Sequence, residues 1–103
     1  MDKKQAVSKF DALASELRLE IVKLLVQFGE DGLVAGEVST QLGIPPNNLS
    51  FHLKTLVHAG LVSVEQEGRF QRYRANTSAL MRLVEYLMAE CCEKQTTPKT
   101  GQC

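Results

Sequence analysis

The chain has 103 residues, of which 44% are hydrophobic and 23% charged, and its formal net charge at pH 7 is zero. This composition is typical of one small globular domain. It excludes a membrane-embedded chain, because no apolar run approaches the roughly 20 residues that span a bilayer. Many nucleic-acid-binding domains are strongly basic. Since this chain is neutral overall, binding to nucleic acid would have to rest on a local concentration of positive charge.

The first half of the chain predicts three helices. Apolar residues recur at helical spacing from Ala6 to Leu13. A second helix follows in ELRLEIVKLLVQFG, with Ser15 as its N-cap and Gly29 as its stop. The stretch GLVAGEVSTQLG predicts a shorter helix that ends at Gly43. The charged N-terminal stretch has no apolar signal core, so we expect a cytoplasmic protein.

The next helix has two contrasting faces. Pro45 and Pro46 interrupt the chain and then permit a new helix, because proline is tolerated in a first helical turn. At about 100° per residue, the segment NNLSFHLKTLVHAG gathers its apolar residues on one face: Leu49, Leu53, Leu56 and Val57. The opposite face carries Asn47, Phe51, Lys54 and His58, with Ser50 and Thr55 at its edges. Packing against a core explains the apolar face, whereas no packing role within the protein explains the side chains of the opposite face.

The last third of the chain predicts a β-hairpin and a long helix. In LVSVEQEGRFQRYRA, strand-forming residues flank a turn at Gly68, and three arginines follow it: Arg69, Arg72 and Arg74. The final helix, TSALMRLVEYLMAECC, begins at a cap from Thr77 or Ser78. Its apolar stripe contains Leu80, Leu83, Val84, Leu87, Met88 and Cys91. Both terminal helices are more apolar than a monomer needs, which favours a homodimer over simple closure of the domain.

A short helix, a break, a helix with a polar face and a basic hairpin form the layout of a winged helix-turn-helix. The expected fold class is mainly α with a small β-hairpin, in a domain over residues 1–92 followed by a flexible tail over residues 93–103. Residues 47–74 contain four Lys or Arg against two Glu. Such a helix can read base edges in the major groove, and the cations can meet phosphates or a narrow minor groove. The candidate DNA-contacting residues are Asn47, Asn48, Ser50, Phe51, His52, Lys54, Thr55, Arg69, Arg72 and Arg74.

Some of these candidates have structural alternatives. His52 lies near the apolar face, so we expect it to pack or to touch a phosphate and not to bind a metal. Arg72 and Arg74 could instead keep an exposed hairpin soluble, although we favour contact with DNA. Phe51 would be explained by local packing, and contact with a thymine methyl group is the other option.

The segments LASELRLEIVKLL and SFHLKTLVHAGLVSVEQEGRFQRYRA resemble the ArsR/SmtB family of metal-responsive bacterial repressors. The resemblance covers about residues 10–90 and is most specific in the Ser-x-His-Leu-x-x-Leu-x-x-Ala-Gly-Leu-Val run at 50–62. It implies a homodimeric repressor whose first and last helices form the dimer interface. Such a repressor binds operator double-stranded DNA when unliganded and releases it when metal binds. The recognition helix would be 47–58, and Gly68 would be the tip of the wing.

All three cysteines lie in the last thirteen residues, at Cys91, Cys92 and Cys103. The family often places cysteines in the helix before the recognition helix, or histidine and carboxylates in the last helix. Neither pattern is present here. Three soft thiolates without a histidine disfavour zinc and suit As(III) or Sb(III), which form three bonds to sulfur. Adjacent helical residues point about 100° apart, so the helix must end near Cys91 for both sulfurs to converge.

The sequence therefore predicts a repressor that As(III) or Sb(III), as the inducer, removes from its operator, with Cys91, Cys92 and Cys103 as ligands. This subgroup of the family carries its ligands at the end of the last helix. We expect no enzymatic activity, organic cofactor or membrane association. Three alternatives concern the cysteines: a redox-sensing repressor in which Cys103 pairs with Cys91 or Cys92, a buried role for Cys91, and a two-thiol site without Cys103.

Two alternatives come from other functional classes. A thiol–disulfide enzyme would use the cysteine pair, but the chain has no Cys-x-x-Cys motif and no candidate base near the thiols. A protein-interaction module would use the polar helix face to bind protein. Its binding would be insensitive to salt, whereas phosphate contacts make DNA affinity fall steeply with ionic strength.

Overall fold

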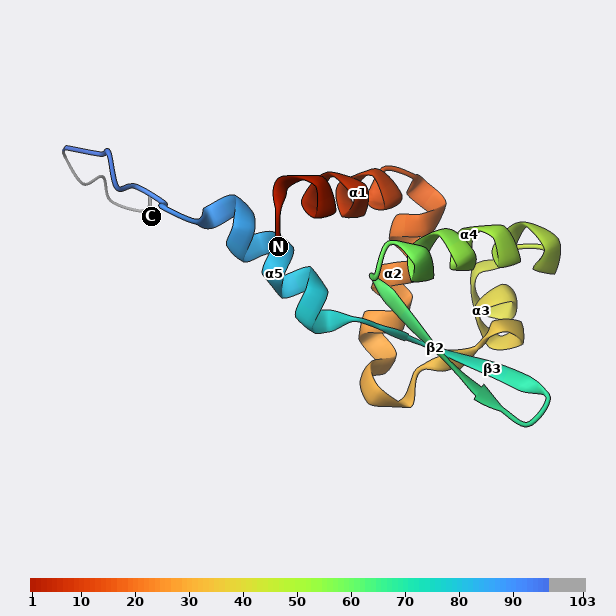
Figure 1. Ribbon diagram of the computed structural model, residues 1–103. Coiled ribbons are helices and arrows are strands. Elements are labelled where there is room, and N and C mark those ends of the chain that lie inside the picture. Colours follow the sequence, from red (N-terminus) through yellow and green to blue (C-terminus); the bar gives the residue numbers. More distant parts are fainter. Residues whose placement is uncertain (97–103) are drawn as a thin grey trace.

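The predicted hairpin belongs to a three-stranded antiparallel sheet in the computed structural model, which describes residues 1–96 (Figure 1). The sheet has the strand order β1-β3-β2. Along the chain the elements are α1 (Lys3–Leu13), α2 (Glu16–Phe28), a 3₁₀ turn (Gly29–Asp31), β1 (Leu33–Val34), α3 (Ala35–Leu42), α4 (Pro46–His58), β2 (Val62–Glu67), β3 (Phe70–Ala75) and α5 (Thr77–Met88). This is the expected mainly helical fold with a wing.

Local signals set most of the helix boundaries as predicted. The Ser15 hydroxyl oxygen accepts a hydrogen bond from the Arg18 backbone N–H at 3.3 Å, and α2 ends at Gly29, whose φ is +53°. Pro46 occupies the first turn of α4, where its missing N–H costs nothing. A small core follows from these helices. Its largest fully buried side chains are Ile21, Leu25, Val38, Leu49, Leu53, Leu56 and Leu61.

The prediction of one helix over GLVAGEVSTQLG is wrong at its N-terminal end. Leu33 and Val34 form β1 and pair with Tyr73 and Arg72 of β3, so the helix begins only at Ala35. The chain enters this strand through Gly32, which has a φ of +59°. A Cβ atom at Gly32 would overlap the carbonyl oxygen of Tyr73, so only glycine fits this close approach.

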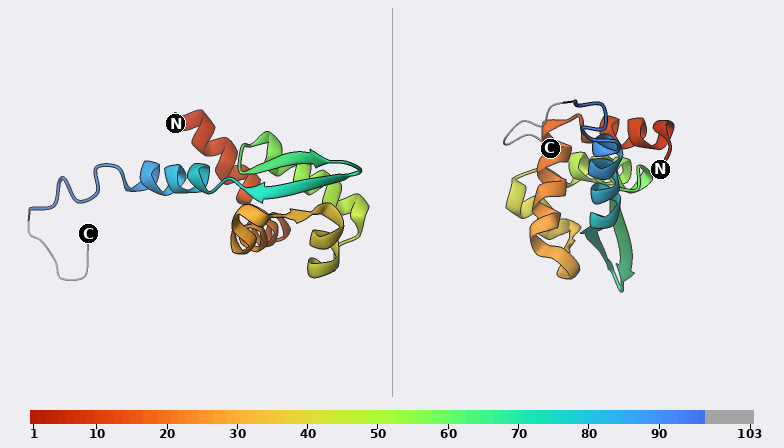
Figure 2. Two further views of the ribbon diagram at one scale, coloured as in Figure 1. Left: turned by 90° about the horizontal axis from the view of Figure 1, so that it is seen from below. Right: turned by 90° about the vertical axis from the view of Figure 1, so that its left-hand side faces the viewer.

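Helix α5 extends away from the body of the domain (Figures 1 and 2). Ala79, in its first turn, and Leu83, near its middle, are its only buried residues. Leu80 is half-buried against the core, and five other large apolar side chains of α5 are exposed in the single chain: Met81, Val84, Tyr86, Leu87 and Met88. Val7 and Phe10 of α1 are exposed as well. None of the helices within residues 1–96 has the length and apolarity needed to cross a membrane.

The N-cap of α5 is Asn76, and the prediction of Thr77 or Ser78 is therefore wrong. The Asn76 side-chain oxygen accepts from the Ala79 backbone N–H at 3.2 Å, and its amide donates to the Gly60 carbonyl at 2.9 Å. The Ser78 hydroxyl donates to the same Asn76 oxygen at 3.0 Å. Asn76 is preferred because its side chain reaches both the helix terminus and the turn after α4, which fixes the direction in which α5 leaves the domain.

We expect Asn76→Ala to lower the free energy of unfolding by about 1–2 kcal/mol, through loss of the cap and of the bond to the Gly60 carbonyl. Urea unfolding at a fixed protomer concentration measures this change. Thr77→Ala is the matched control, since Thr77 is exposed and makes no cap bond, and it should change stability by less than about 0.5 kcal/mol. Equal effects of the two substitutions would contradict the assignment of the cap.

Candidate nucleic-acid interface

The polar face of α4 is presented to solvent, opposite the core residues Leu49, Leu53 and Leu56. Five of the candidate DNA-contacting residues on this helix are exposed: Asn47, Asn48, Ser50, Phe51 and Lys54. The Thr55 hydroxyl donates to the Phe51 carbonyl of its own helix at 3.1 Å, which occupies its hydrogen atom. The helix thus offers amides, a hydroxyl, a cation and a phenyl ring that the fold itself does not use.

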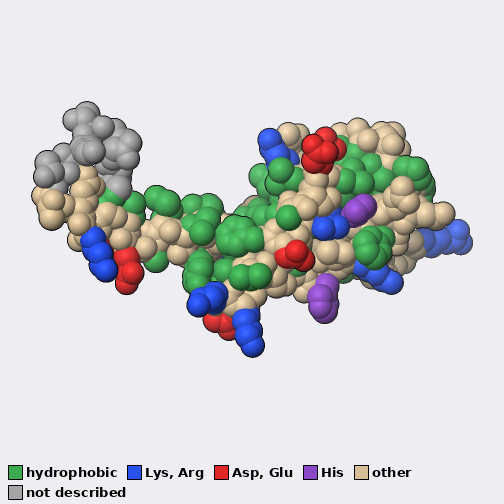
Figure 3. All heavy atoms as spheres, turned by 90° about the horizontal axis from the view of Figure 1, so that it is seen from above, with side chains coloured by type: hydrophobic (Ala, Val, Ile, Leu, Met, Phe, Trp, Pro, Cys, Tyr) green, Lys and Arg blue, Asp and Glu red, His purple; other side chains and the backbone are tan. Residues whose placement is uncertain are grey.

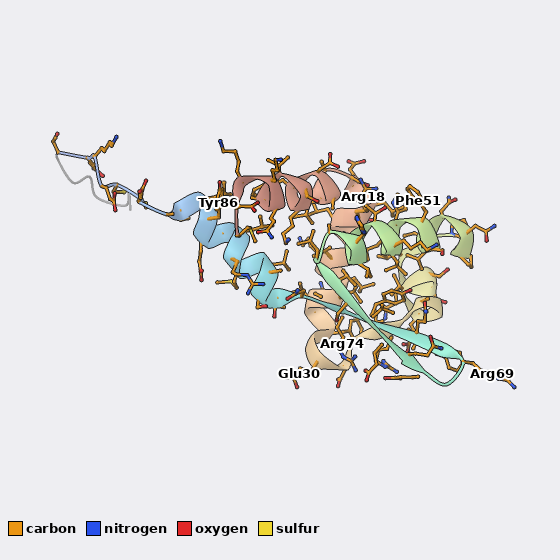
Figure 4. The ribbon with its side chains drawn as sticks, in the orientation of Figure 1. Arg18, Glu30, Phe51, Arg69, Arg74 and Tyr86 are labelled. Carbon is orange, nitrogen blue, oxygen red and sulfur yellow. The ribbon has the colours of Figure 1, made fainter. Side chains whose placement is uncertain are left out.

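The wing ends in a tight turn at Gly68, where φ is +58°. The Gln66 side-chain amide donates to the Gly68 carbonyl at 2.8 Å and closes this turn. Arg69 lies at the tip and points away from the body of the domain (Figure 4). Its neighbour Phe70 is also exposed. The tip therefore presents a cation and an aromatic ring at the far end of the hairpin.

Arg72 and Arg74 use their guanidinium donors in hydrogen bonds to other residues of the protein. Arg72 Nε donates to both carboxylate oxygens of Glu67, at 2.9 and 3.0 Å, and Arg72 Nη1 donates to the Asp31 carbonyl at 3.0 Å. Arg74 Nη1 donates to a Glu65 carboxylate oxygen at 2.7 Å, and Arg74 Nε donates to the Glu30 carbonyl at 2.6 Å (Figure 4). The hydrogen bond with Glu67 raises the pKa of Arg72. These bonds tie the hairpin to the turn after α2.

The ion pairs of the hairpin, which include a longer contact of 3.9 Å between Arg74 and Glu67, explain where the local positive charge lies. Glu65 and Glu67 neutralise Arg74 and Arg72, which leaves the net charge of this segment on Lys54 of α4 and Arg69 of the wing. Within residues 1–96, neither Lys54 nor Arg69 forms an ion pair. DNA contact by Arg72 and Arg74 stays a prediction, but any such contact would compete with the bonds described above.

His52 is half-buried and contacts a residue that the sequence reasoning missed. Its Nδ1 lies 3.2 Å from Nη1 of Arg18, and Arg18 Nε donates to the Ala12 carbonyl at 2.7 Å. Because a guanidinium can only donate, Nδ1 of His52 must accept and its ring proton must be on Nε2. Arg18 lies seven residues before the buried Leu25, on the apolar stripe of α2. A charged residue on an apolar stripe was the sequence feature that could have indicated a buried contact for Arg18.

The chain leaves the helical path before the cysteine pair. Helix α5 ends at Met88, and Glu90 and Cys92 have φ values of +63° and +64°, which are uncommon outside glycine. Cys91 is exposed and is not part of this chain's core. Because the chain is no longer helical at this point, the two side chains can approach each other, and the Sγ atoms of Cys91 and Cys92 lie 3.3 Å apart.

Cys92 takes part in a disulfide in this structure, so the pair could bind a soft ion only after that disulfide is reduced. Two sulfurs at about 2.3 Å from a common ion, the usual zinc–sulfur distance, are at most about 4.6 Å apart. The observed separation of 3.3 Å is within that limit. Over residues 1–96 no group of three His, Cys, Asp or Glu side chains is placed to hold a metal. Cys103, the third predicted ligand, lies outside the described residues.

Comparison with known proteins places this arrangement in a family. Residues 13–65 match a family model described as a helix-turn-helix domain. The chain is 32% identical over 84 residues to the arsenical resistance operon repressor of Bacillus subtilis, a match covering 82% of this chain and 76% of that protein. Another Bacillus subtilis regulator, YdfF, is 33% identical over 84 residues, but the chain spans only 36% of its length.

Solved structures agree with these matches. An ArsR-like transcriptional regulator from Rhodococcus sp. RHA1 has a TM-score of 0.76 at 31% identity, with 88% of this chain and 83% of that chain covered. The homodimeric winged helix-turn-helix DNA-binding domain of Mb0332 from Mycobacterium bovis has a TM-score of 0.67 at 29% identity, with 93% and 89% covered. The protein therefore belongs to the ArsR family of DNA-binding, winged helix-turn-helix transcriptional regulators.

Proposed function

We propose that the protein is a homodimeric cytoplasmic repressor that leaves its operator when As(III) or Sb(III) binds to Cys91, Cys92 and Cys103. The observation that carries this proposal is the 3.3 Å separation of the Cys91 and Cys92 sulfurs directly after α5. That helix has an exposed apolar face and is the element best suited to pair with a second copy. A ligand bound at its end would act on the dimer.

The dimer is supported by the position and composition of α5. A stable interface buries about 800 Å² on each partner. A helix that projects from the domain with exposed apolar side chains would contribute to such a surface (Figure 3). The Mb0332 relative is a homodimer. Pairing through α5 would present two α4 helices to two operator half-sites about 34 Å apart, one turn of DNA.

The chemistry of induction needs only the thiols and the inducer. Arsenite exchanges its three hydroxyl groups for three thiolate sulfurs, and the three thiol protons leave with those hydroxyls as water. Bonds from one arsenic atom to both Cys91 and Cys92 would fix the turn that follows α5 and thereby shift the helix within the dimer. A coupling of about 1–3 kcal/mol between ligand and DNA sites is typical and lowers DNA affinity roughly five- to 150-fold.

The direct test is a titration of fluorescently labelled operator with the protein, followed by arsenite. The reductant should be a phosphine, because dithiol reductants chelate arsenite themselves. We expect binding in the absence of arsenite and release when it is added. Release by hydrogen peroxide but not by arsenite would contradict the proposal and would favour the redox-sensing alternative, which uses the same cysteines.

The wing provides a separate prediction. Arg69→Ala should weaken binding to all duplex sequences alike and should reduce the slope of log affinity against log salt by about 0.9 for each protomer, the value for one lost phosphate contact. Anisotropy titrations at several salt concentrations measure the slope. Lys23→Ala removes an exposed cation from α2 and serves as the control. An equal loss of slope in both variants would argue against a contact by the wing tip.

A further inference from the structure

We propose that Phe51 reads the 5-methyl group of a thymine in each operator half-site, and that Arg18 and His52 hold its ring in position. This inference rests on the proposed binding of DNA through α4. It adds a specificity-determining residue and two positioning residues to that function.

The exposure of Phe51 has no explanation within the fold. Its side chain is 66% exposed on the polar face of α4, between residues that can reach base edges (Figure 4). A phenyl ring cannot exchange hydrogen bonds with bases. The only apolar group that a base pair presents in the major groove is the thymine methyl, so this is the feature that a phenyl ring can recognise there.

The ring is held from one side by its neighbour. Residues adjacent on a helix point about 100° apart, yet the rings of Phe51 and His52 meet edge to face, with centroids 5.7 Å apart and planes at 75°. This is a favourable aromatic geometry. Fixing the ring before DNA binds reduces the entropy lost on contact.

His52 is itself fixed by Arg18. The guanidinium contacts His52 Nδ1 at 3.2 Å and the Ala12 carbonyl at 2.7 Å, using two different nitrogen atoms. Ala12 lies in the last turn of α1 and is buried. A continuous series of contacts therefore connects the end of α1 to the phenyl ring, through a fork of donors that only arginine offers.

The test compares thymine with deoxyuridine, which pairs identically but lacks the methyl group. An operator is first selected from random duplex DNA, and each of its thymines is then replaced singly. For the parent protein we expect one thymine in each half-site whose replacement weakens binding about fourfold, the value for one buried methyl-sized group. Replacing both should weaken binding roughly sixteenfold, because separated positions are nearly additive.

Variants assign this discrimination to particular residues. In Phe51→Ala the thymine-to-deoxyuridine ratio should fall to about one. Phe70→Ala is the matched control, because Phe70 is a phenylalanine of similar exposure on the wing, and it should keep the fourfold ratio. Arg18→Lys keeps the charge but cannot make both contacts at once. Its ratio should fall below about twofold, while its affinity for the deoxyuridine operator stays close to that of the parent.

The outcomes separate the inference from the function on which it rests. If the protein binds a selected operator specifically but no thymine methyl affects the affinity, the proposed role of Phe51 is wrong and the proposed function is unaffected. A full fourfold ratio in Arg18→Lys would overturn the positioning role of Arg18. Failure to select any sequence would overturn both this inference and the proposed function.

Discussion

Leu87→Glu is expected to convert the proposed dimer into a monomer and to weaken operator binding at least about a hundredfold. Leu87 is 65% exposed in the single chain, one turn beyond the buried Leu83 on the same stripe of α5. An uncompensated charge in a buried interface costs about 3–5 kcal/mol. In a symmetric dimer the substitution occurs twice. The monomer would then bind one half-site and lose the gain from simultaneous engagement of two, which is typically 10²–10⁴-fold.

Sedimentation velocity measures the change in assembly, and operator titration measures its effect on DNA binding. Leu19→Glu is the matched control, because Leu19 is also an exposed leucine, at 46%, but lies on α2 among the charged residues Glu16, Glu20 and Lys23. This control should stay dimeric and bind the operator. A Leu87→Glu protein that sediments as a dimer would show that the apolar face of α5 is not the interface.

The parts of the fold that could be predicted from the sequence are those with local signals. The bounds of α2 follow from a cap at Ser15 and a stop at Gly29. The start of α4 follows from Pro46, and the division between its buried and exposed faces follows from helical periodicity. The wing tip follows from Gly68 between strand-forming residues. Each of these signals lies within a few residues of its effect.

The errors concern partners that are distant along the chain. A strand of two residues has no periodicity, and β1 exists because Leu33 pairs with Tyr73, forty positions later. The cap of α5 could not be predicted, because Asn76 owes its advantage to the Gly60 carbonyl as well as to the helix terminus. Tertiary contacts of this kind override local propensity.

At the candidate site the residue types could be predicted, but not all of their contacts. Asn47, Phe51 and Lys54 are exposed together on α4 as expected. The pairing of the hairpin arginines was missed, although two glutamates and two arginines alternate on facing strands. In the observed register Glu65 lies opposite Arg72, and the ion pairs form along the diagonals, Glu67 to Arg72 and Glu65 to Arg74. Diagonal neighbours are within reach of long side chains.

A Cys91→Ser/Cys92→Ser protein is expected to bind the operator as tightly as the parent and to remain bound when arsenite is added. Serine keeps the size and polarity of the side chain but replaces a soft sulfur ligand with a hydroxyl that does not retain arsenic. Arsenite should therefore no longer lower the DNA affinity of this variant, whereas it should lower that of the parent roughly five- to 150-fold. Anisotropy titration with arsenite under phosphine reductant measures it.

The intact DNA binding of this variant is what makes the result informative. Both cysteines lie beyond α5 and outside the core, so their replacement should change neither the folding of the domain nor the exposed face of α4. Cys103→Ser gives a graded comparison: with two thiolates left, arsenic would keep one hydroxyl, and we expect a weaker but detectable release. If the double variant still releases DNA as readily as the parent, Cys91 and Cys92 are not part of the sensing site. Cys103 is the one thiol that this variant keeps, and a single thiol cannot supply the three sulfur ligands of the proposed site.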